Sequence, residues 1–288
     1  MTANHSADPS AATAAIRHVE IGCRNLARSR EFYSELLGFP EVAAESGISW
    51  LDAGPARIKL VEVGEGDLGG WEPDDLQCGM RHVGMKVGDV DAQAARLREA
   101  GVEFTAHPKD AHGGVRITFF TDPDGTLLEF VEGAVQHDEI ASHELAAEDL
   151  AAHQNRPRAA GPVFDHVAVT APDLQEALDF YVRTLGARVI GKLVRGDDPR
   201  GFVITNVRVG DVVLELFTFR SETRPSTWSA GQSRHGLRSL GLGVAEARGA
   251  VGAMTAAGAG AVLRPGTEPL LIDPHGVPLT ITTRAVGG

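Results

Sequence analysis

The sequence predicts an α+β protein made of four βαβββ modules, and three observations support this. Segments 16–39 and 163–186 repeat each other: each reads as a short alternating strand with a histidine, a turn, and a helix closed by Leu-Gly. Segments 81–101 and 238–258 repeat the strand and the helix with different helix sequences. β-rich sequence follows each of the four segments. Internal repetition of this kind indicates repeated structural units.

The elements of each module follow from residue spacing and turn signals. In the first and third helices apolar residues recur at helical spacing, and Gly38 or Gly186 ends the helix, because glycine adopts the left-handed conformation at low cost. Asp-Pro-Asp-Gly and Asp-Pro-His-Gly predict tight turns between strands at 122–125 and 273–276. The predicted strand regions after the helices include 57–63, 116–132, 202–219 and 269–283.

The order of these elements predicts two domains joined by a linker. We expect a short flexible tail over 1–15, a first domain over 16–133, a helical linker over 134–162 and a second domain over 163–288. The linker has no strand pattern and is rich in acidic residues, which predicts a solvated helix over 138–153. The modules of the two domains are expected at 16–66 and 80–133, and at 163–220 and 237–285.

Composition and charge narrow the class of partner. The 288 residues carry a net charge of −12, which disfavours binding to nucleic acid or to an anionic membrane. No apolar run is long enough to span a bilayer, and the start of the chain lacks the pattern of a secretory signal. Two cysteines without a CxxC pair exclude a disulfide framework and a thiolate zinc finger. We expect a cytoplasmic protein with a small-molecule partner.

The repeats resemble a known family. The paired His-Val strands, the Phe-Tyr helices that end in Leu-Gly, and the Asp-Pro-Asp-Gly hairpin followed by Leu-Glu-Phe are similar to the vicinal oxygen chelate (VOC) superfamily. That superfamily includes glyoxalase I, epimerases, extradiol dioxygenases and drug-resistance proteins. The resemblance covers 16–133 and 163–285 and implies two glyoxalase-like domains with cupped, mixed β-sheets. It specifies the fold far better than the reaction, because this fold supports many chemistries.

The resemblance implies one divalent metal ion per chain, held by strand residues of two modules. Carried onto the first domain, it gives the ligands His18, Glu62, His82 and Glu129. Two imidazoles and two carboxylates suit Zn, Ni, Fe, Mn or Co and leave positions open for water or substrate. In the second domain, His166 and Glu215 correspond to His18 and Glu62. Ser239 and Thr280 stand at the positions equivalent to His82 and Glu129, so that site is incomplete.

A second pairing of modules remains open. Some members of the superfamily exchange modules between domains, which would give the ligand set His82, Glu129, His166 and Glu215. His18, Glu62, Ser239 and Thr280 would then form the incomplete site. We favour pairing within the first domain, because the connection between Glu62 and His82 is short.

The ligand set favours redox-neutral chemistry. A metal-bound substrate with adjacent oxygens acidifies a neighbouring C–H, and a carboxylate such as Glu62 or Glu129 can move the proton. We therefore expect an isomerase, epimerase or glyoxalase-like lyase acting on a small vicinally oxygenated metabolite. The first alternative is an Fe(II)-dependent extradiol-type dioxygenase, and the second is a protein that sequesters a drug or metabolite without chemistry. A monomer and a homodimer are both compatible with four modules in one chain.

Overall fold

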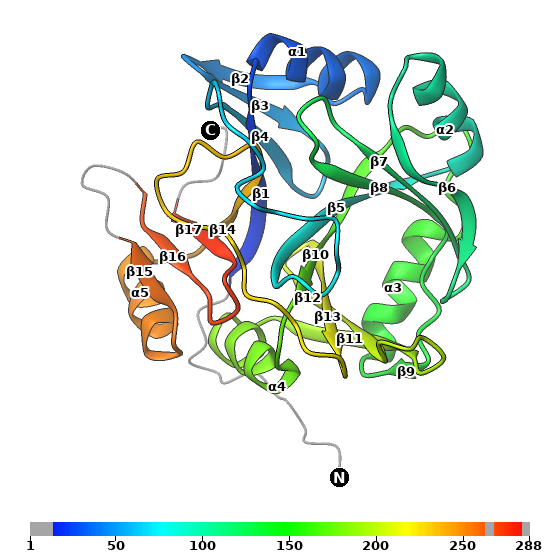
Figure 1. Cartoon of the computed structure of the whole chain (residues 1–288). Coiled ribbons are helices and arrows are strands. Elements are labelled where there is room, and N and C mark those ends of the chain that lie inside the picture. Colours follow the sequence, from blue (N-terminus) through cyan, green and yellow to red (C-terminus); the bar gives the residue numbers. More distant parts are fainter. Residues whose placement is uncertain (1–13, 263–267, 284–288) are drawn as a thin grey trace.

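The computed structural model describes residues 14–262 and 268–283, and over these residues the chain forms two mixed β-sheets with few helices (Figure 1). One sheet has eight strands and the other has nine, which confirms the predicted α+β class. The expected tail over 1–15 lies outside the described residues except for its last two positions, which begin the first strand region.

The first sheet combines strands from the two ends of the chain. Its order is β15-β16-β17-β14-β1-β4-β3-β2. The strands from the N-terminal part are β1 (Ala15–Cys23), β2 (Glu41–Glu45), β3 (Ile48–Asp52) and β4 (Arg57–Glu62). Those from the C-terminal part are β14 (Gly236–Gly243), β15 (Gly260–Val262), β16 (Leu270–Ile272) and β17 (Pro278–Thr282).

The second sheet is formed by the middle of the chain. Its order is β6-β7-β8-β5-β10-β13-β12-β11-β9. Its first strands along the chain are β5 (Gly79–Val87), β6 (Phe104–Ala111), β7 (Val115–Thr121), β8 (Leu127–Glu132) and β9 (Glu139–Ile140). The others are β10 (Val163–Thr170), β11 (Arg188–Arg195), β12 (Phe202–Val209) and β13 (Val212–Phe219).

The sheets show that modules are exchanged between the two halves of the chain. β1 pairs antiparallel with β14, and β5 pairs antiparallel with β10, so the first module joins the fourth and the second joins the third. The favoured pairing of the first two modules is therefore wrong. The connection over 63–78 does not force local closure, because an extended chain of this length spans about 50 Å. This connection instead runs beside segment 224–234, with bridges between Asp67 and Arg234 and between Gln77 and Arg224.

The repeated helices contain the same irregularity in both halves. α1 (Leu26–Arg30) continues into a π-helical turn η1 (Glu31–Leu36), and α4 (Leu174–Leu178) continues into η2 (Asp179–Thr184). The tyrosine of each Phe-Tyr pair is buried and donates a hydrogen bond to the aspartate of an Asp-Pro-X-Gly turn, Tyr33 to Asp122 at 2.9 Å and Tyr181 to Asp273 at 2.6 Å. These contacts link module one to two and module three to four, although the sheets pair the modules differently.

The remaining helices are α2 (Val90–Glu99), α3 (His143–His153) and α5 (Ala247–Ala256). The linker helix begins at His143 rather than at 138, because residues 139–140 add β9 to the edge of the second sheet beside β11, and Ser142 then caps the helix. Within the described ranges, no helix is long and apolar enough to cross a membrane.

Candidate metal centre

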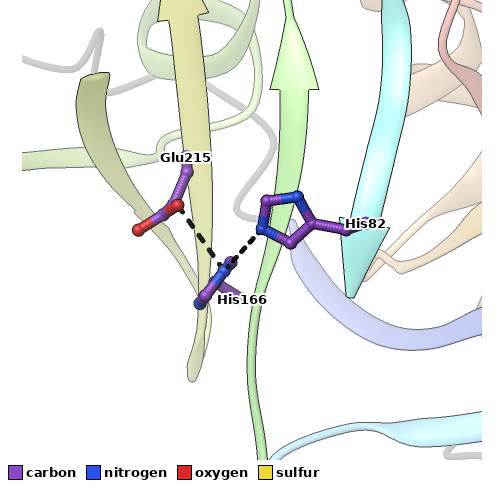
Figure 2. Close-up of side chains that lie close together, drawn as sticks. All are labelled: His82, His166 and Glu215. Carbon is purple, nitrogen blue, oxygen red and sulfur yellow. Dashed lines mark hydrogen bonds and ion pairs between the residues drawn. The ribbon is translucent and has the colours of Figure 1, made fainter. Parts of the chain in front are cut away.

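Four ligand-type side chains converge on one face of the second sheet, and three of them are drawn in Figure 2. The Nε2 atoms of His82 and His166 lie 3.2 Å apart. Glu129 Oε2 lies 3.2 Å from His82 Nε2 and 3.1 Å from His166 Nε2. Glu215 Oε2 lies 3.5 Å from His166 Nε2. The side chains come from β5, β8, β10 and β13.

Strand register explains why these four residues meet. His82 and Glu215 both stand opposite Ala168, in one row across β5, β10 and β13. Glu129 and His166 both stand opposite Gly84, in the next row. A side chain at Gly84 would overlap the His166 ring, so glycine at this position is what lets the imidazole lie over the sheet. Small residues at the centre of each row leave the four larger side chains to meet above them.

The electrostatics of the cluster depend on its burial and on its mixed charges. Burial raises the pKa of Glu129, but hydrogen bonds to His166 and His82 outweigh it and hold the pKa at about 2. Burial lowers the pKa of His166, but the carboxylates of Glu215, Asp165 and Glu129 raise it well above its usual value. Burial raises the pKa of Glu215. Three carboxyl groups, those of Glu129, Glu215 and Asp165, thus surround the imidazoles in a largely buried site.

Asp165 orients one of the imidazoles and was not singled out from the sequence. Its Oδ2 lies 2.8 Å from His166 Nδ1, so the ring donates from Nδ1 and directs Nε2 toward the cluster. His153 of the linker helix places Nε2 3.7 Å from the other oxygen of Asp165 and 3.6 Å from Asp149. The dipeptide Asp-His at 165–166 is the signal that sequence reasoning could have used.

The donor set fits a divalent metal ion. Ligand atoms bound about 2.1 Å from one ion lie about 3.0–3.4 Å from each other in octahedral or tetrahedral geometry. The distances between His82, His166 and Glu129 are 3.1–3.2 Å, which is this spacing. Two neutral imidazoles and two carboxylates would also neutralise a divalent charge in a buried place.

The cluster opens into a cavity of about 380 Å³. Three aromatic side chains, Phe119, Phe202 and Phe217, form part of its wall. Lys86 lies in the same wall, almost fully buried, and its Nζ donates to the carbonyl of Gly133 at 2.7 Å. Further lining residues carry charge of both signs: Asp75, Lys109, Asp165, Arg195, Asp198 and Arg200. A small polar molecule with an apolar portion matches this lining.

Two residues of the favoured ligand set lie elsewhere. His18 is buried on β1 in the first sheet. Its ring packs edge-on against Trp50, with 4.9 Å between the ring centroids. Glu62 is exposed at the end of β4, and its Oε1 accepts a hydrogen bond from the backbone N–H of Leu26 at 3.1 Å. Glu62 therefore contacts neither His18 nor the cluster, and the structure instead brings together the alternative set.

Register also corrects the alignment of Glu62 with Glu215. Glu215 pairs with Ala168, two residues after His166, whereas the residue that pairs with Glu20, two residues after His18, is Lys59. Lys59 is thus the counterpart of Glu215. The other two equivalences hold, because Ser239 lies opposite Glu20 as His82 lies opposite Ala168, and Thr280 lies opposite Gly241 as Glu129 lies opposite Gly84.

Comparison with known proteins identifies the family. The model of the Glyoxalase/Bleomycin resistance protein/Dioxygenase superfamily matches residues 15–130 and 163–270, which is more than half of the chain. The chain belongs to this superfamily.

The curated relatives are shorter proteins, and each match covers less than half of this chain. An uncharacterized protein, YaeR of Escherichia coli, is 33% identical over 122 residues, which cover 41% of this chain and 95% of that protein. A lactoylglutathione lyase of Neisseria meningitidis is 28% identical over 137 residues, which cover 43% of this chain and 94% of that protein.

Among solved structures, glyoxalase I from Zea mays shares the fold of almost the whole chain. It has a TM-score of 0.66 and 18% identity, and the match covers 93% of this chain and 92% of that chain. A putative dioxygenase from Bacillus subtilis matches with a TM-score of 0.57 and 16% identity, over 96% of this chain and 87% of that chain. At these identities the likeness shows the fold alone.

Proposed function

We propose that this protein is a metal-dependent enzyme that moves a proton within a small metabolite carrying two adjacent oxygen atoms. The observation that supports it is the convergence of His82, Glu129 and His166 at spacings of 3.1–3.2 Å, with Glu215 3.5 Å from His166, beside a cavity of about 380 Å³. Similarity to lactoylglutathione lyases supports a glyoxalase-like lyase or isomerase within this class.

The four side chains would hold one divalent ion such as Zn, Ni, Fe, Mn or Co. Such an ion, when bound, supplies Lewis acidity that lowers the pKa of a C–H next to a coordinated carbonyl. Asp165 accepts a hydrogen bond from the Nδ1–H of His166. The lone pair on Nε2 of His166 is therefore directed at the cluster.

The carboxylates are the groups suited to accept and return the substrate proton. Glu129 and Glu215 both line the cavity, and no other glutamate among the described residues does so. Phe119, Phe202 and Phe217 line the same cavity and give it an apolar portion. Glu215 thus takes the place that the sequence had suggested for Glu62 as a candidate base.

Deuterium exchange tests this proposal without assuming the final product. The chain is loaded separately with each candidate ion and incubated with S-lactoylglutathione in D₂O, and NMR follows the hydrogen on the hydroxyl-bearing carbon. We expect exchange with at least one ion, and at least about 100-fold slower exchange in Glu129→Gln and Glu215→Gln. Arg183→Gln serves as the control, because it removes an exposed charge that pairs with Asp179 and does not line the cavity.

The contrary results are distinct. Absence of exchange with every ion, for S-lactoylglutathione and for a panel of small 2-hydroxy ketones, contradicts the proposal. Oxygen uptake with a catechol in the Fe(II)-loaded chain alone would replace it with the extradiol-type alternative. Tight 1:1 binding of a small molecule by a chain that retains no ion would replace it with sequestration.

A further inference from the structure

The first sheet carries a second cavity at the place equivalent to the candidate metal centre. Its volume is about 500 Å³. Lys59, Ser239 and Thr280, the counterparts of Glu215, His82 and Glu129, all line it. Arg234, Arg238 and Glu20 line it as well. Both sheets thus have a cavity at the equivalent place, but the side chains that line the two cavities differ in chemistry.

Among the described lining residues that are not exposed, three are cationic and one, Glu20, is acidic. Glu20 already accepts from two of these cations, Lys59 Nζ and Arg238 Nε, each at 2.9 Å. Arg234 adds a third cation. The acidic residues that also line the cavity or face Arg234 are exposed at the rim: Glu45, Asp67 and Glu268.

Arg234 is buried without a full set of partners. Its residue is 6% exposed, and its Nε and Nη1 atoms have no hydrogen-bond partner among the described residues. Ser239, 3% exposed in the same lining, also has a hydroxyl without a partner. Burial lowers the pKa of Arg234 only to about 10, so it stays charged at neutral pH. Buried donors left unpaired are costly, so a ligand that accepts from them would be stabilising.

We propose that this cavity binds a small organic anion through its carboxylate or phosphate group, with Arg234 as the principal contact and Ser239 as a second donor. Guanidinium groups present paired N–H donors that match both oxyanions. The same cations would repel a divalent metal ion, so this cavity takes a ligand of opposite charge to the one on the second sheet. Lys59 and Arg238 remain with Glu20 and add long-range attraction.

Calorimetry on the full-length, metal-loaded protein tests the proposal with defined probes. Inorganic phosphate and succinate represent the two oxyanions, and succinamide is the uncharged control. We expect 1:1 binding of at least one anion, weakened tenfold or more in Arg234→Gln and only slightly in Arg234→Lys. Ser239→Ala should weaken binding by a smaller factor. Arg183→Gln removes an equal charge elsewhere and should bind as the unchanged chain does.

A further variant separates this cavity from the metal centre. Anion binding that persists in His82→Ala but fails in Arg234→Gln supports the proposal. Binding lost in His82→Ala and kept in Arg234→Gln would place the anion on the metal and overturn it. Equal binding of succinamide, or no binding of either anion to a chain whose circular dichroism shows it to be folded, would also overturn it.

Discussion

The two sheets present the same four positions with opposite chemistry. The second sheet has His82, Glu129, His166 and Glu215, and the first has Ser239, Thr280, His18 and Lys59. Three of the four positions have changed, and at one of them a carboxylate is replaced by an ammonium. Loss of metal-binding character is therefore more than the loss of ligands, because Lys59 supplies a charge that opposes a cation.

The histidine that both sheets retain shows how surroundings decide the properties of one residue type. His166 lies over Gly84 and His18 lies over Gly241, and a side chain at either glycine would overlap the ring. Three carboxylates raise the pKa of His166, whereas burial and the charge of Lys59 lower the pKa of His18 to about 4. Glycine beneath the ring lets each sheet accommodate the imidazole, but the charged neighbours of the imidazole determine whether it can take part in metal binding.

The largest expected effect comes from removing each histidine in turn. His166→Ala should reduce metal content from one ion per chain to almost none, because a lost ligand costs more than the 10- to 100-fold that follows loss of an outer partner. His18→Ala should keep its ion. Mass spectrometry of protein purified without a chelating tag measures both. Loss of the ion in His18→Ala and its retention in His166→Ala would show that the first sheet, not the second, binds the metal.

A designed second site tests whether Lys59 blocks metal binding on the first sheet. The double variant Ser239→His with Thr280→Glu should still bind one ion per chain, because the ammonium of Lys59 remains beside the new ligands. Adding Lys59→Glu and Glu20→Ala should raise the content to two ions, because Glu20 stands where the second sheet has the small Ala168. Two ions already in the double variant would show that charge at position 59 is unimportant.

A smaller effect is expected from the residue that orients His166. Asp165→Asn should weaken metal binding about 10- to 100-fold, because the amide no longer fixes the Nδ1–H form of the ring. Competition with a coloured chelator measures the affinity. Arg17 precedes His18 as Asp165 precedes His166, so Arg17→Gln is the matched control and should leave the affinity unchanged. Equal metal affinities in the unchanged chain, Asp165→Asn and Arg17→Gln would show that Asp165 does not support metal binding through His166.

The histidine of the first sheet should affect the pH dependence of stability rather than metal binding. Because the pKa of His18 is about 4 in the folded chain and its ordinary value is 6.5, the unfolded chain binds a proton that the folded chain refuses between these values. The contribution of His18 to the free energy of unfolding should therefore fall by about 3 kcal/mol as pH falls from 7 to below 4.

His18→Gln should lack this part of the pH dependence, as urea unfolding at pH 8 and pH 5 can show. The exposed His143 provides the control, since His143→Gln should follow the unchanged chain at both pH values. A decline from pH 8 to pH 5 that is as steep in His18→Gln as in the unchanged chain would contradict the assignment.

Much of the candidate site was accessible from sequence because repeats mark equivalent positions. Comparing Arg-His-Val-Gly-Met with Arg-Ser-Leu-Gly-Leu correctly aligned His82 with Ser239, and the Asp-Pro-X-Gly turns correctly aligned Glu129 with Thr280. The alignment failed at Glu62, where a Glu near the end of a strand looked like Glu215. The turn before the strand carrying Lys59 is 53–56, whereas its counterpart before Glu215 is the shorter 210–211, so only the pairing with β1 reveals the register.

The sequence by itself determined the modules, their class and the types of side chain available for a metal, because local periodicity and turn residues act over a few positions. Only the tertiary structure decided which modules share a sheet, since edge strands of equivalent modules offer the same backbone hydrogen bonds to either partner. That choice placed His82 and Glu129 beside His166 and Glu215 rather than beside His18. The buried tyrosine contacts join the modules in the other combination, so side-chain contacts and strand pairing link different modules.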